Sequence, residues 1–450
     1  MPLVTRPKII VLDDDPTGSQ TVHSCLLLTR WDVDTLCRGL TDPAPIFFIL
    51  TNTRALAPEI AAEVTRTVCR HLKEAIAQVG ITDYLVVSRS DSTLRGHYPL
   101  ETDVIATELG PFDAHFLVPA FLEGGRITRD SQHYLIVEGQ PVPVHETEFA
   151  RDSVFGYQHS YLPDYVAEKT QGRISTTAVA RFLLADVRNP ATLLSRLSQL
   201  TGNVCGVVDA ETQEDLDQFA AAVLQVVSQG KRFLFRSAAS LLTALAQLPP
   251  QPTPPEAMAT YCRPGRYGAV LVGSHVRKTT EQLAALLEEP TVFPIEVPVA
   301  RLRDSAAAEP DIINEVLAAV DQAIAREKTP VIFTSREELT FADAATRLAF
   351  GQRVSEVLMA IVQQLPTDLR YLISKGGITS NDVLSKGLNL ASVRLLGQVI
   401  PGCSVVRTPA DHPRFPVLPV VLFPGNVGDR EALRTVYQRF QGKGTALEAE

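Results

Sequence analysis

The chain has 450 residues, of which 45% are apolar and 21% charged, and its 42 basic and 51 acidic side chains give a net charge of −9. This length and composition predict a globular enzyme of two or three domains. The acidic balance argues against a nucleic-acid-binding protein, which needs a basic stripe to neutralise phosphates. No apolar run approaches the ~20 residues needed to span a bilayer.

The six cysteines are scattered and include no Cys-x-x-Cys pair. This usage predicts reduced thiols rather than disulfides or a zinc site. The first apolar strand begins at residue 8, which leaves no room for a signal peptide before it. We therefore expect a cytoplasmic protein that associates with neither membranes nor nucleic acid.

Short apolar runs alternate with longer helical patterns along the first half of the chain. Strands are predicted at 8–13, 46–51, 84–88, 115–118, 203–208 and 232–235, and helices at 57–78, 98–109, 211–229 and 237–247. Such alternation is typical of a parallel sheet flanked by helices. Residues 122–160 interrupt it with several glycines and prolines, and predict an elaborate loop or hairpin.

A proline-rich tract at residues 249–255 predicts a boundary between two domains. Its sequence, Pro-Pro-Gln-Pro-Thr-Pro-Pro, cannot pack as a core element and favours a stiff, extended spacer. We expect an N-terminal domain over residues 1–248 and a C-terminal domain over residues 256–450.

After this tract the alternation of strands and helices resumes. Strands are predicted at 268–272, 292–297, 330–334, 370–373 and 418–423, and helices at 277–289, 311–326, 341–365 and 429–439. The predicted fold class is α/β, with two domains that each contain a largely parallel sheet flanked by helices. The active site is expected in a cleft between the two domains.

Three consecutive aspartates, Asp13, Asp14 and Asp15, stand at the carboxyl end of the first predicted strand, before a turn that contains Pro16 and Gly18. Adjacent carboxylates repel one another, so folding alone gives no reason to cluster them. Such groups are used to hold cations, to take up protons or to attack phosphorus. The cluster therefore predicts a site rather than a solvated strand end.

Two further polar clusters follow the next predicted strands, at residues 51–54 and 88–97. The carboxyl ends of neighbouring parallel strands meet at one edge of a sheet, so these clusters should lie beside the aspartates. Arg54 or Arg95 could bind a carboxylate bidentately, and Ser92 and Thr93 could bond to hydroxyls. The combined groups suit a small polyhydroxylated acid.

Three glycine turns follow apolar strands in the second half, at Gly273-Ser274, at residues 376–379 and at residues 425–428. A strand, a glycine turn and a helix N-terminus together form an anion site, because backbone N–H groups and the helix dipole point outward. Three such turns at one sheet edge predict a phosphate-bearing nucleotide. None of them is a Walker P-loop, because the second glycine of that motif is missing.

The spacing Asp13-x-Asp15-x-Thr17 after an apolar strand also resembles the first motif of haloacid-dehalogenase-like phosphatases. In that interpretation Asp13 would be the nucleophile and would form an aspartyl phosphate. It leaves the glycine turns of the second half without a function. A third hypothesis is a protein that binds a nucleotide and a metabolite without chemistry.

A second resemblance extends over more than 400 residues, with several motifs in the same order. The matching motifs are Asp14-Asp15-Pro16-Thr17-Gly18, Arg54, Ser92-Thr93-Leu94-Arg95-Gly96-His97, Gly273-Ser274, Gly376-Gly377-Ile378-Thr379, Pro401-Gly402 and Gly425-Asn426-Val427-Gly428. With them the chain resembles the four-carbon acid sugar kinase family, which couples an N-terminal substrate domain to a C-terminal nucleotide domain. The chain departs from the family pattern at Asp13, Pro16, His97 and Ile378, and these departures bear on substrate identity.

The resemblance implies an ATP-dependent kinase that phosphorylates a hydroxyl of a small sugar acid such as a threonate, an erythronate or an oxo-tetronate. Mg²⁺ should accompany ATP, with no ligands assigned, and the relatives suggest a homodimer. Asp14 or Asp15 would orient or deprotonate the attacking hydroxyl. The acid would be bound by Asp15, Arg54, Ser92, Thr93, Leu94 and Arg95, and the nucleotide by Gly273, Ser274, Gly376, Gly377, Ile378, Thr379, Gly402, Gly425, Asn426 and Gly428.

Overall fold

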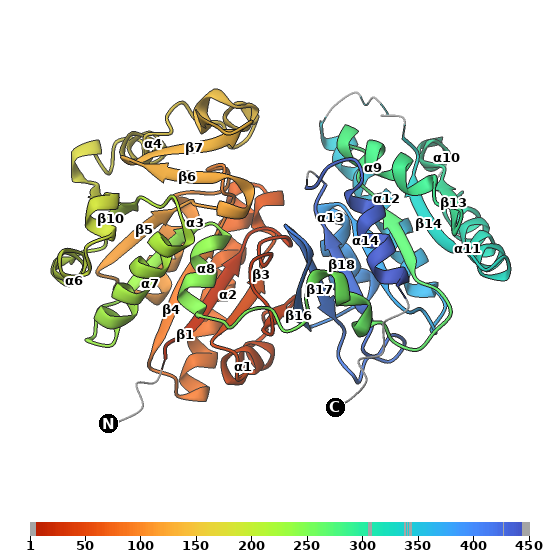
Figure 1. The fold of residues 1–450 in the computed structure, drawn as a ribbon, viewed down its shortest axis with the longest axis horizontal. Helices are drawn as coiled ribbons and strands as arrows, with labels where there is room; N and C mark the ends of the chain where they lie inside the picture. Colours follow the sequence, from red (N-terminus) through yellow and green to blue (C-terminus); the bar gives the residue numbers. More distant parts are fainter. Residues whose placement is uncertain are drawn as a thin grey trace. The chain divides into compact units, whose positions relative to one another are not determined.

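The computed structural model describes residues 6–304, 308–336, 339, 341, 344–425 and 427–442. The chain divides into two compact units, Met1–Pro250 and Gln251–Glu450 (Figure 1). Each unit contains a mainly parallel sheet with helices against it, which confirms the predicted α/β class. Within the described residues, no helix has both the length and the apolar character that crossing a membrane requires.

The sheet of the first unit has the strand order β2-β3-β1-β4-β11-β5-β10-β9, and neighbouring strands are parallel. Its strands are β1 (Lys8–Asp13), β2 (Leu26–Leu28), β3 (Ile46–Leu50), β4 (Tyr84–Arg89), β5 (Ala114–Val118), β9 (Ala180–Phe182), β10 (Val204–Val208) and β11 (Phe233–Ser237). The sequence did not predict β2 and β9. Each has only three residues, too few to show a periodicity.

Helices cover both faces of this sheet. They are α1 (Val33–Thr41), α2 (Pro58–Val79), α3 (Leu100–Leu109), α4 (Leu162–Lys169), α5 (Leu184–Val187), α6 (Pro190–Gln199), α7 (Gln213–Val227) and α8 (Ala239–Ala246). On one face, Ile10 and Leu12 of β1 share a buried cluster with Leu36, Leu72 and Ile105 of α1, α2 and α3. On the other, the ring of Phe219 in α7 meets Phe116 of β5 edge-on at 5.4 Å.

The interrupted segment of the first unit forms a small antiparallel sheet of β6 (Arg126–Arg129), β7 (Gln132–Val137) and β8 (Gln140–Pro143). Gly139 lies in the turn between β7 and β8 with φ of +78°, a conformation that glycine adopts without strain. The expected loop or hairpin is therefore a meander, and its residues return in the candidate site below.

The sheet of the second unit has the order β13-β14-β12-β15-β18-β17-β16, parallel up to β18 and antiparallel beyond it. Its strands are β12 (Ala269–Val272), β13 (Val292–Val297), β14 (Thr329–Thr334), β15 (Leu372–Lys375), β16 (Ser392–Ile400), β17 (Cys403–Arg407) and β18 (Pro419–Phe423). The accompanying helices are α9 (Arg277–Leu287), α10 (Val299–Asp304), α11 (Glu309–Ala325), α12 (Ala344–Gln364), α13 (Gly377–Asp382) and α14 (Ala432–Gln441). The hairpin of β16 and β17 was not predicted from the sequence.

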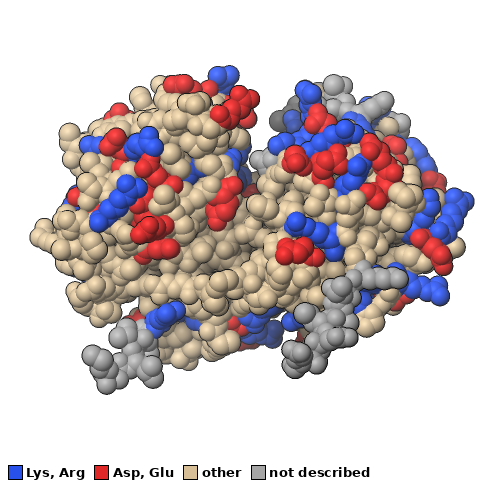
Figure 2. All heavy atoms as spheres, viewed as in Figure 1, with Lys and Arg blue, Asp and Glu red and all other residues tan. Residues whose placement is uncertain are grey.

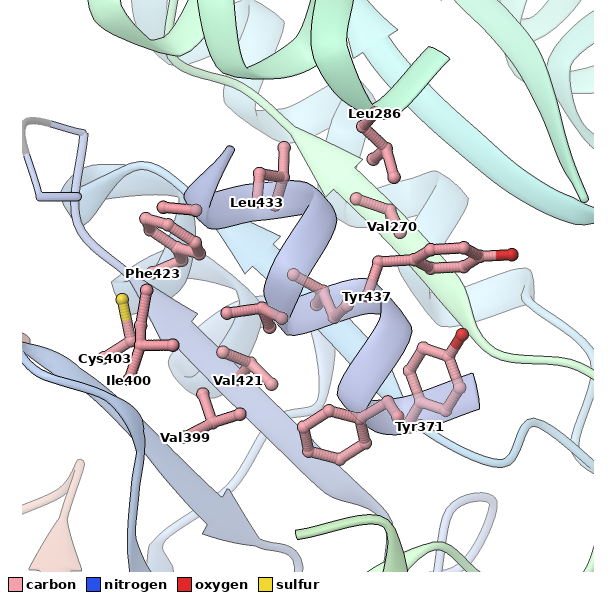
Figure 3. Close-up of a cluster of buried hydrophobic side chains, with 14 of the residues drawn as sticks. Val270, Leu286, Tyr371, Val399, Ile400, Cys403, Val421, Phe423, Leu433 and Tyr437 are labelled. Atoms are coloured by element: carbon pink, nitrogen blue, oxygen red, sulfur yellow. The ribbon is translucent and has the colours of Figure 1, made fainter. Parts of the chain in front are cut away.

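The last described helix, α14, closes the core of the second unit over this hairpin (Figure 3). Leu433 and Tyr437 of α14 belong to the same buried cluster as Val421 and Phe423 of β18, and the hairpin contributes Ile400 to it. The buried residues of α14 recur three and four positions apart, so they form one apolar face that packs against the core.

Acidic and basic side chains are intermixed on the visible face of each unit (Figure 2). In the second unit, for example, Arg434 of α14 pairs with Glu288 beyond α9 and with Glu431. Acidic side chains on this face therefore lie among basic ones rather than gathering into a patch of one sign.

Candidate functional site

The predicted acidic turn lies at the carboxyl edge of the first sheet, where β1, β3 and β4 end together. In the register of the sheet, Asp13 stands between Leu50 of β3 and Arg89 of β4. The polar residues that follow each strand therefore meet at this edge, as expected for parallel strands. The structure brings Asp14, Asp15 and Arg54 into direct contact.

Asp14 is almost completely buried, and its carboxylate has its hydrogen-bonding groups in place. Arg54 donates to it through Nε at 3.2 Å and Nη2 at 2.5 Å, and Ser90 Oγ donates at 2.9 Å. Only 2% of the side chain is exposed. A carboxylate that is buried and bidentately paired is suited to hold Arg54 in place rather than to meet a ligand.

Asp15 is the accessible carboxylate of the three, with 24% of its side chain exposed. Its Oδ1 accepts a hydrogen bond from Thr17 N at 2.8 Å, and Arg54 Nη1 lies 3.3 Å from its Oδ2. Burial would raise the pKa of Asp15, but Arg54, Arg89 and the bonds from Thr17 outweigh it and leave the pKa below its usual value. Asp15 is therefore ionised at neutral pH and points one oxygen toward Arg54.

Asp13 is fully buried beneath the turn, and a Cβ at Gly18 would lie only 2.0 Å from Asp13 Oδ1. Its Oδ2 has no hydrogen-bond partner among the described residues. Burial raises the pKa of Asp13 to about 8, although Arg89 opposes the shift. A buried carboxyl that is protonated at neutral pH is unsuited to the role of nucleophile that the phosphatase interpretation gave to Asp13.

The raised pKa of Asp13 predicts a pH-dependent gain in stability for Asp13→Asn. Between pH 4 and 8 the folded protein keeps a proton on Asp13 that the unfolded chain has lost, so wild-type stability falls as pH rises through this range. Asparagine resembles the protonated acid and does not titrate, so the stability of the variant does not fall with pH through this residue. Urea unfolding should show similar stabilities at pH 4 and a widening advantage for the variant toward pH 8, at most ~1.4 kcal/mol per pH unit. An advantage that shrinks with rising pH would contradict the shift.

The predicted acid-binding loop, Ser92–Arg95, is fixed by side chains from the segment that follows the meander and from β7. His133 contacts the carbonyl of Ser92 at 2.7 Å, and the hydroxyls of Tyr157 and Tyr165 donate to the carbonyls of Thr93 and Leu94 at 2.7 and 2.8 Å. Leu94 has φ of +67°, a strained value for this residue type. Three consecutive carbonyls are thus held in a conformation that the loop would not adopt alone.

Asp91 organises the polar side chains of this loop. Arg95 Nε donates to Asp91 Oδ2 at 2.6 Å, and Thr93 Oγ1 donates to the same oxygen at 2.5 Å. Burial alone would raise the pKa of Asp91, but Arg54 and Arg95 hold it well below its usual value. Of the predicted acid-binding residues, Leu94 and Arg95 line a small pocket at this edge, whereas Asp15, Arg54, Ser92 and Thr93 are not among its lining residues.

Sequence reasoning missed Arg236 and Ser237, which end β11 at the same edge. Arg236 is buried and donates to Ser88 Oγ at 2.7 Å, to Ser90 Oγ and to Glu101. The signal was present, because these two polar residues directly follow the predicted strand 232–235. The rule that was applied to the other strand ends would have found them.

The second unit contains a larger pocket, with about 1250 Å³ of empty space counted with its open side. The predicted nucleotide-binding residues that line it are Gly273, Ser274, Gly376, Gly377, Ile378 and Thr379. The same pocket is also lined by apolar residues of α12, namely Phe350, Val354, Leu358 and Met359. A pocket that combines glycine turns with apolar side chains offers a nucleotide backbone N–H groups for its phosphates and an apolar surface for its base.

Two glycines of this pocket are required by close packing. Gly376 has φ of +123°, and its N–H donates to Phe423 O at 2.8 Å. A Cβ at Gly273 would lie 2.2 Å from Thr379 Oγ1. The two turns are therefore packed against each other, and no larger residue fits at Gly273 without displacing Thr379.

The remaining predicted glycines lie near this pocket but do not line it. Gly425 accepts a hydrogen bond from Thr279 at 3.1 Å, and Gly428, with φ of +78°, begins the approach to α14. Gly402 turns between β16 and β17, and the register of Ser404 opposite Leu422 places this turn at the carboxyl edge of β18. Asn426 lies outside the described residues.

A buried lysine, Lys375, supports the Pro424-Gly425 turn and was also missed. Its Nζ donates to Pro424 O at 2.6 Å and lies 3.9 Å from the centre of the Phe423 ring. Burial lowers the pKa of Lys375 to about 7. In the part of the chain that the structure describes, no carboxylate forms an ion pair with it.

Comparison with protein-family models matches each unit to a different domain family. A model described as a sugar-binding N-terminal domain matches residues 9–245, and one described as a nucleotide-binding C-terminal domain matches residues 269–433. The chain belongs to the four-carbon acid sugar kinase family. The two pockets thus lie within a matched sugar-binding domain and a matched nucleotide-binding domain of that family.

Two curated members of this kinase family align with the chain. The D-erythronate kinase of Heliobacterium modesticaldum is 28% identical over 291 residues, which cover 62% of this chain and 60% of that protein. The D-threonate kinase of Bordetella bronchiseptica is 28% identical over 225 residues, 48% of this chain and 50% of that protein. The chain therefore spans little more than half the length of the curated relatives it matches.

A crystal structure described as a putative tRNA synthase from Salmonella typhimurium has the same fold. It superposes with a TM-score of 0.70 at 19% identity, over 97% of this chain and 100% of that one. At this identity the likeness concerns the fold alone.

Few carboxylates that could hold a metal ion line the two pockets of this chain. Within the described ranges, no group of three histidine, cysteine or acidic side chains is placed to bind a metal. Asp382 lines the larger pocket, but Lys386 Nζ lies 3.2 Å from its Oδ1. Mg²⁺ that arrives with a nucleotide needs only one or two carboxylates, because phosphate oxygens and water supply its other ligands.

Proposed function

We propose that this protein is an ATP-dependent kinase that phosphorylates a hydroxyl of a small, four-carbon sugar acid. One observation carries the proposal: a single chain combines a small pocket lined by Asp91, Arg95 and Arg236, in a sugar-binding domain, with a large pocket of glycine turns in a nucleotide-binding domain. The matched relatives are kinases of D-erythronate and D-threonate. These acids, together with oxo-tetronates, define the proposed substrate class.

Asp15 would act on the attacking hydroxyl, and Asp14 would act through Arg54. The partial exposure of Asp15 lets it meet a substrate, whereas Asp14 is buried against Arg54. Because the pKa of Asp15 is lowered, the residue is a weak base. Its main role would be to orient the hydroxyl toward the phosphorus, which phosphoryl transfer requires more than basicity.

In the second unit, the adenine would pack against the apolar residues of α12 and the phosphates would lie at the turns around Gly273 and Gly376. The N-terminus of α9, which follows the Ser274 turn, would add its dipole to phosphate binding. Mg²⁺ is expected to arrive with ATP and to supply charge neutralisation at the transferred phosphoryl group.

A coupled assay of ADP formation tests the proposed function. Purified protein with ATP and Mg²⁺ should form ADP when D-erythronate, D-threonate, their enantiomers or an oxo-tetronate is added, and not without an acid. Release of phosphate from sugar phosphates, with no ADP from any acid, would instead support the phosphatase interpretation. Saturable ATP binding without turnover of any acid would identify a binding protein.

A further inference from the structure

The small pocket of the first unit contains a buried hydroxyl that no contact explains. Ser237 ends β11, is 2% exposed and lines this pocket. Its Oγ has no hydrogen-bond partner among the described residues. A buried hydroxyl without a partner is unfavourable for folding, so its presence at a pocket wall points to a ligand.

The chemistry around Ser237 suits the hydroxyl of a polyol. Arg236 lines the same pocket and brings N–H groups, and Asp91 brings carboxylate oxygens that accept, whereas the hydroxyl of Ser90 already donates to Asp14. Leu117 and Pro119 add apolar side chains to the lining. The space inside the pocket is about 20 Å³, room for one hydroxyl-sized group rather than for a whole acid.

The part of the pocket wall formed by Leu94 and Tyr165 is rigid. Leu94 lines the pocket with its strained backbone, and Tyr165, which also lines it, donates its hydroxyl to Leu94 O at 2.8 Å. Both side chains are buried. The pocket is therefore formed before a ligand arrives, as sites that discriminate by shape require.

A short chain of contacts connects this pocket to the accessible carboxylate. Ser90, on the pocket wall, donates to Asp14, which is paired with Arg54, and Arg54 in turn contacts Asp15. Because β1, β4 and β11 end at the same sheet edge, an acid with one hydroxyl at Ser237 would extend along the edge on which Asp15 lies.

We propose that Ser237 is a specificity-determining residue that hydrogen-bonds a hydroxyl of the sugar acid other than the one that is phosphorylated. The proposal rests on the proposed function for the identity of the acid. It concerns a residue outside the motifs that the family resemblance assigns to acid binding.

Ser237→Ala separates a ligand contact from a structural role, because the two predict opposite changes. Removal of an unpartnered hydroxyl should leave the thermal unfolding midpoint unchanged or raise it. Loss of one hydrogen bond to the acid should weaken acid binding by about 3- to 10-fold, measured by calorimetry, with ATP affinity unchanged. Ser404→Ala is the matched control, because Ser404 Oγ is also buried without a partner but lies in β17, away from both pockets.

Analogues identify the hydroxyl that Ser237 contacts. The dissociation constants of D-erythronate and of the three dihydroxybutanoates that each lack one hydroxyl are measured with wild type and Ser237→Ala. One dihydroxybutanoate should bind both proteins equally, while the other acids lose affinity in the variant. Equal loss for every acid, no loss for any acid, or a lowered unfolding midpoint in Ser237→Ala would overturn the proposal.

The binding measurements also distinguish this inference from the proposed function. ADP formation with unchanged acid affinity in Ser237→Ala would leave the kinase standing and refute the role of Ser237. Acid binding that depends on Ser237, without ADP formation, would refute the kinase and support the subsite. Absence of acid binding to wild type would refute both.

Discussion

Replacement of Asp15 by asparagine is expected to reduce ADP formation by ~10²- to 10⁴-fold, the range for loss of a positioned acid–base group. The residue is the accessible carboxylate of the acidic turn, and its ionised oxygen faces Arg54. Asparagine keeps the size of the side chain and its bond from Thr17 but removes the charge that would orient the attacking hydroxyl. The loss should appear mainly in kcat, with ATP affinity unchanged.

Asp13→Asn is the matched control for this experiment. Asp13 is two residues away, fully buried and protonated at neutral pH, so asparagine resembles its native state. The variant should therefore retain most of the kinase activity. The phosphatase interpretation predicts the reverse order, in which Asp13→Asn abolishes turnover and Asp15→Asn does not.

Gly376→Ala and Gly377→Ala should separate two reasons for glycine in the larger pocket. Gly376 is needed for the backbone conformation, and Gly377 leaves space for the phosphates. Gly376 has a positive φ, and a Cβ there would lie 3.0 Å from Thr379 Oγ1. Gly376→Ala should therefore destabilise the protein by ~1–3 kcal/mol and lower its affinity for ATP at least tenfold. A Cβ at Gly377 would meet no atom within 4 Å. Gly377→Ala should have the stability of wild type but a lower affinity for ATP, because the methyl group occupies space that the phosphates would approach.

Urea unfolding and calorimetric titration with ATP measure these two effects. Gly230→Ala, at φ of +97° in the first unit, supplies comparable backbone strain away from the pocket and should leave ATP affinity unchanged. Wild-type ATP affinity in Gly377→Ala would show that the phosphates do not lie at this turn.

Regular strands and helices of both units were predictable because their signals are local. Helix α2 shows why: buried residues recur three and four positions apart, Pro58 starts the helix and Gly80 ends it with a positive φ. The hairpin of β16 and β17 was missed although its signal is also local, because the Pro401-Gly402 turn alone joins the two strands. The domain boundaries, the cleft between the domains and the homodimer stay predictions.

The candidate sites were predictable to the extent that parallel strands end at one sheet edge. That rule placed the acidic turn beside Arg54 and gathered six of the predicted residues around the larger pocket. It did not rank Asp13, Asp14 and Asp15, which are adjacent in sequence and chemically identical. Their difference comes from Gly18 above Asp13, Arg54 against Asp14 and the partial exposure of Asp15.

The sequence by itself determined the α/β class, the family and the strand ends that carry polar residues, because periodicity and motifs are properties of neighbouring residues. Only the tertiary structure decided which carboxylate is accessible, that Arg54 and Arg95 are both already paired with carboxylates, and that Ser237 has an unused hydroxyl. Burial and hydrogen bonding depend on side chains that arrive from β3, β4 and β11, dozens to hundreds of residues away. Such contacts leave no local pattern in the chain.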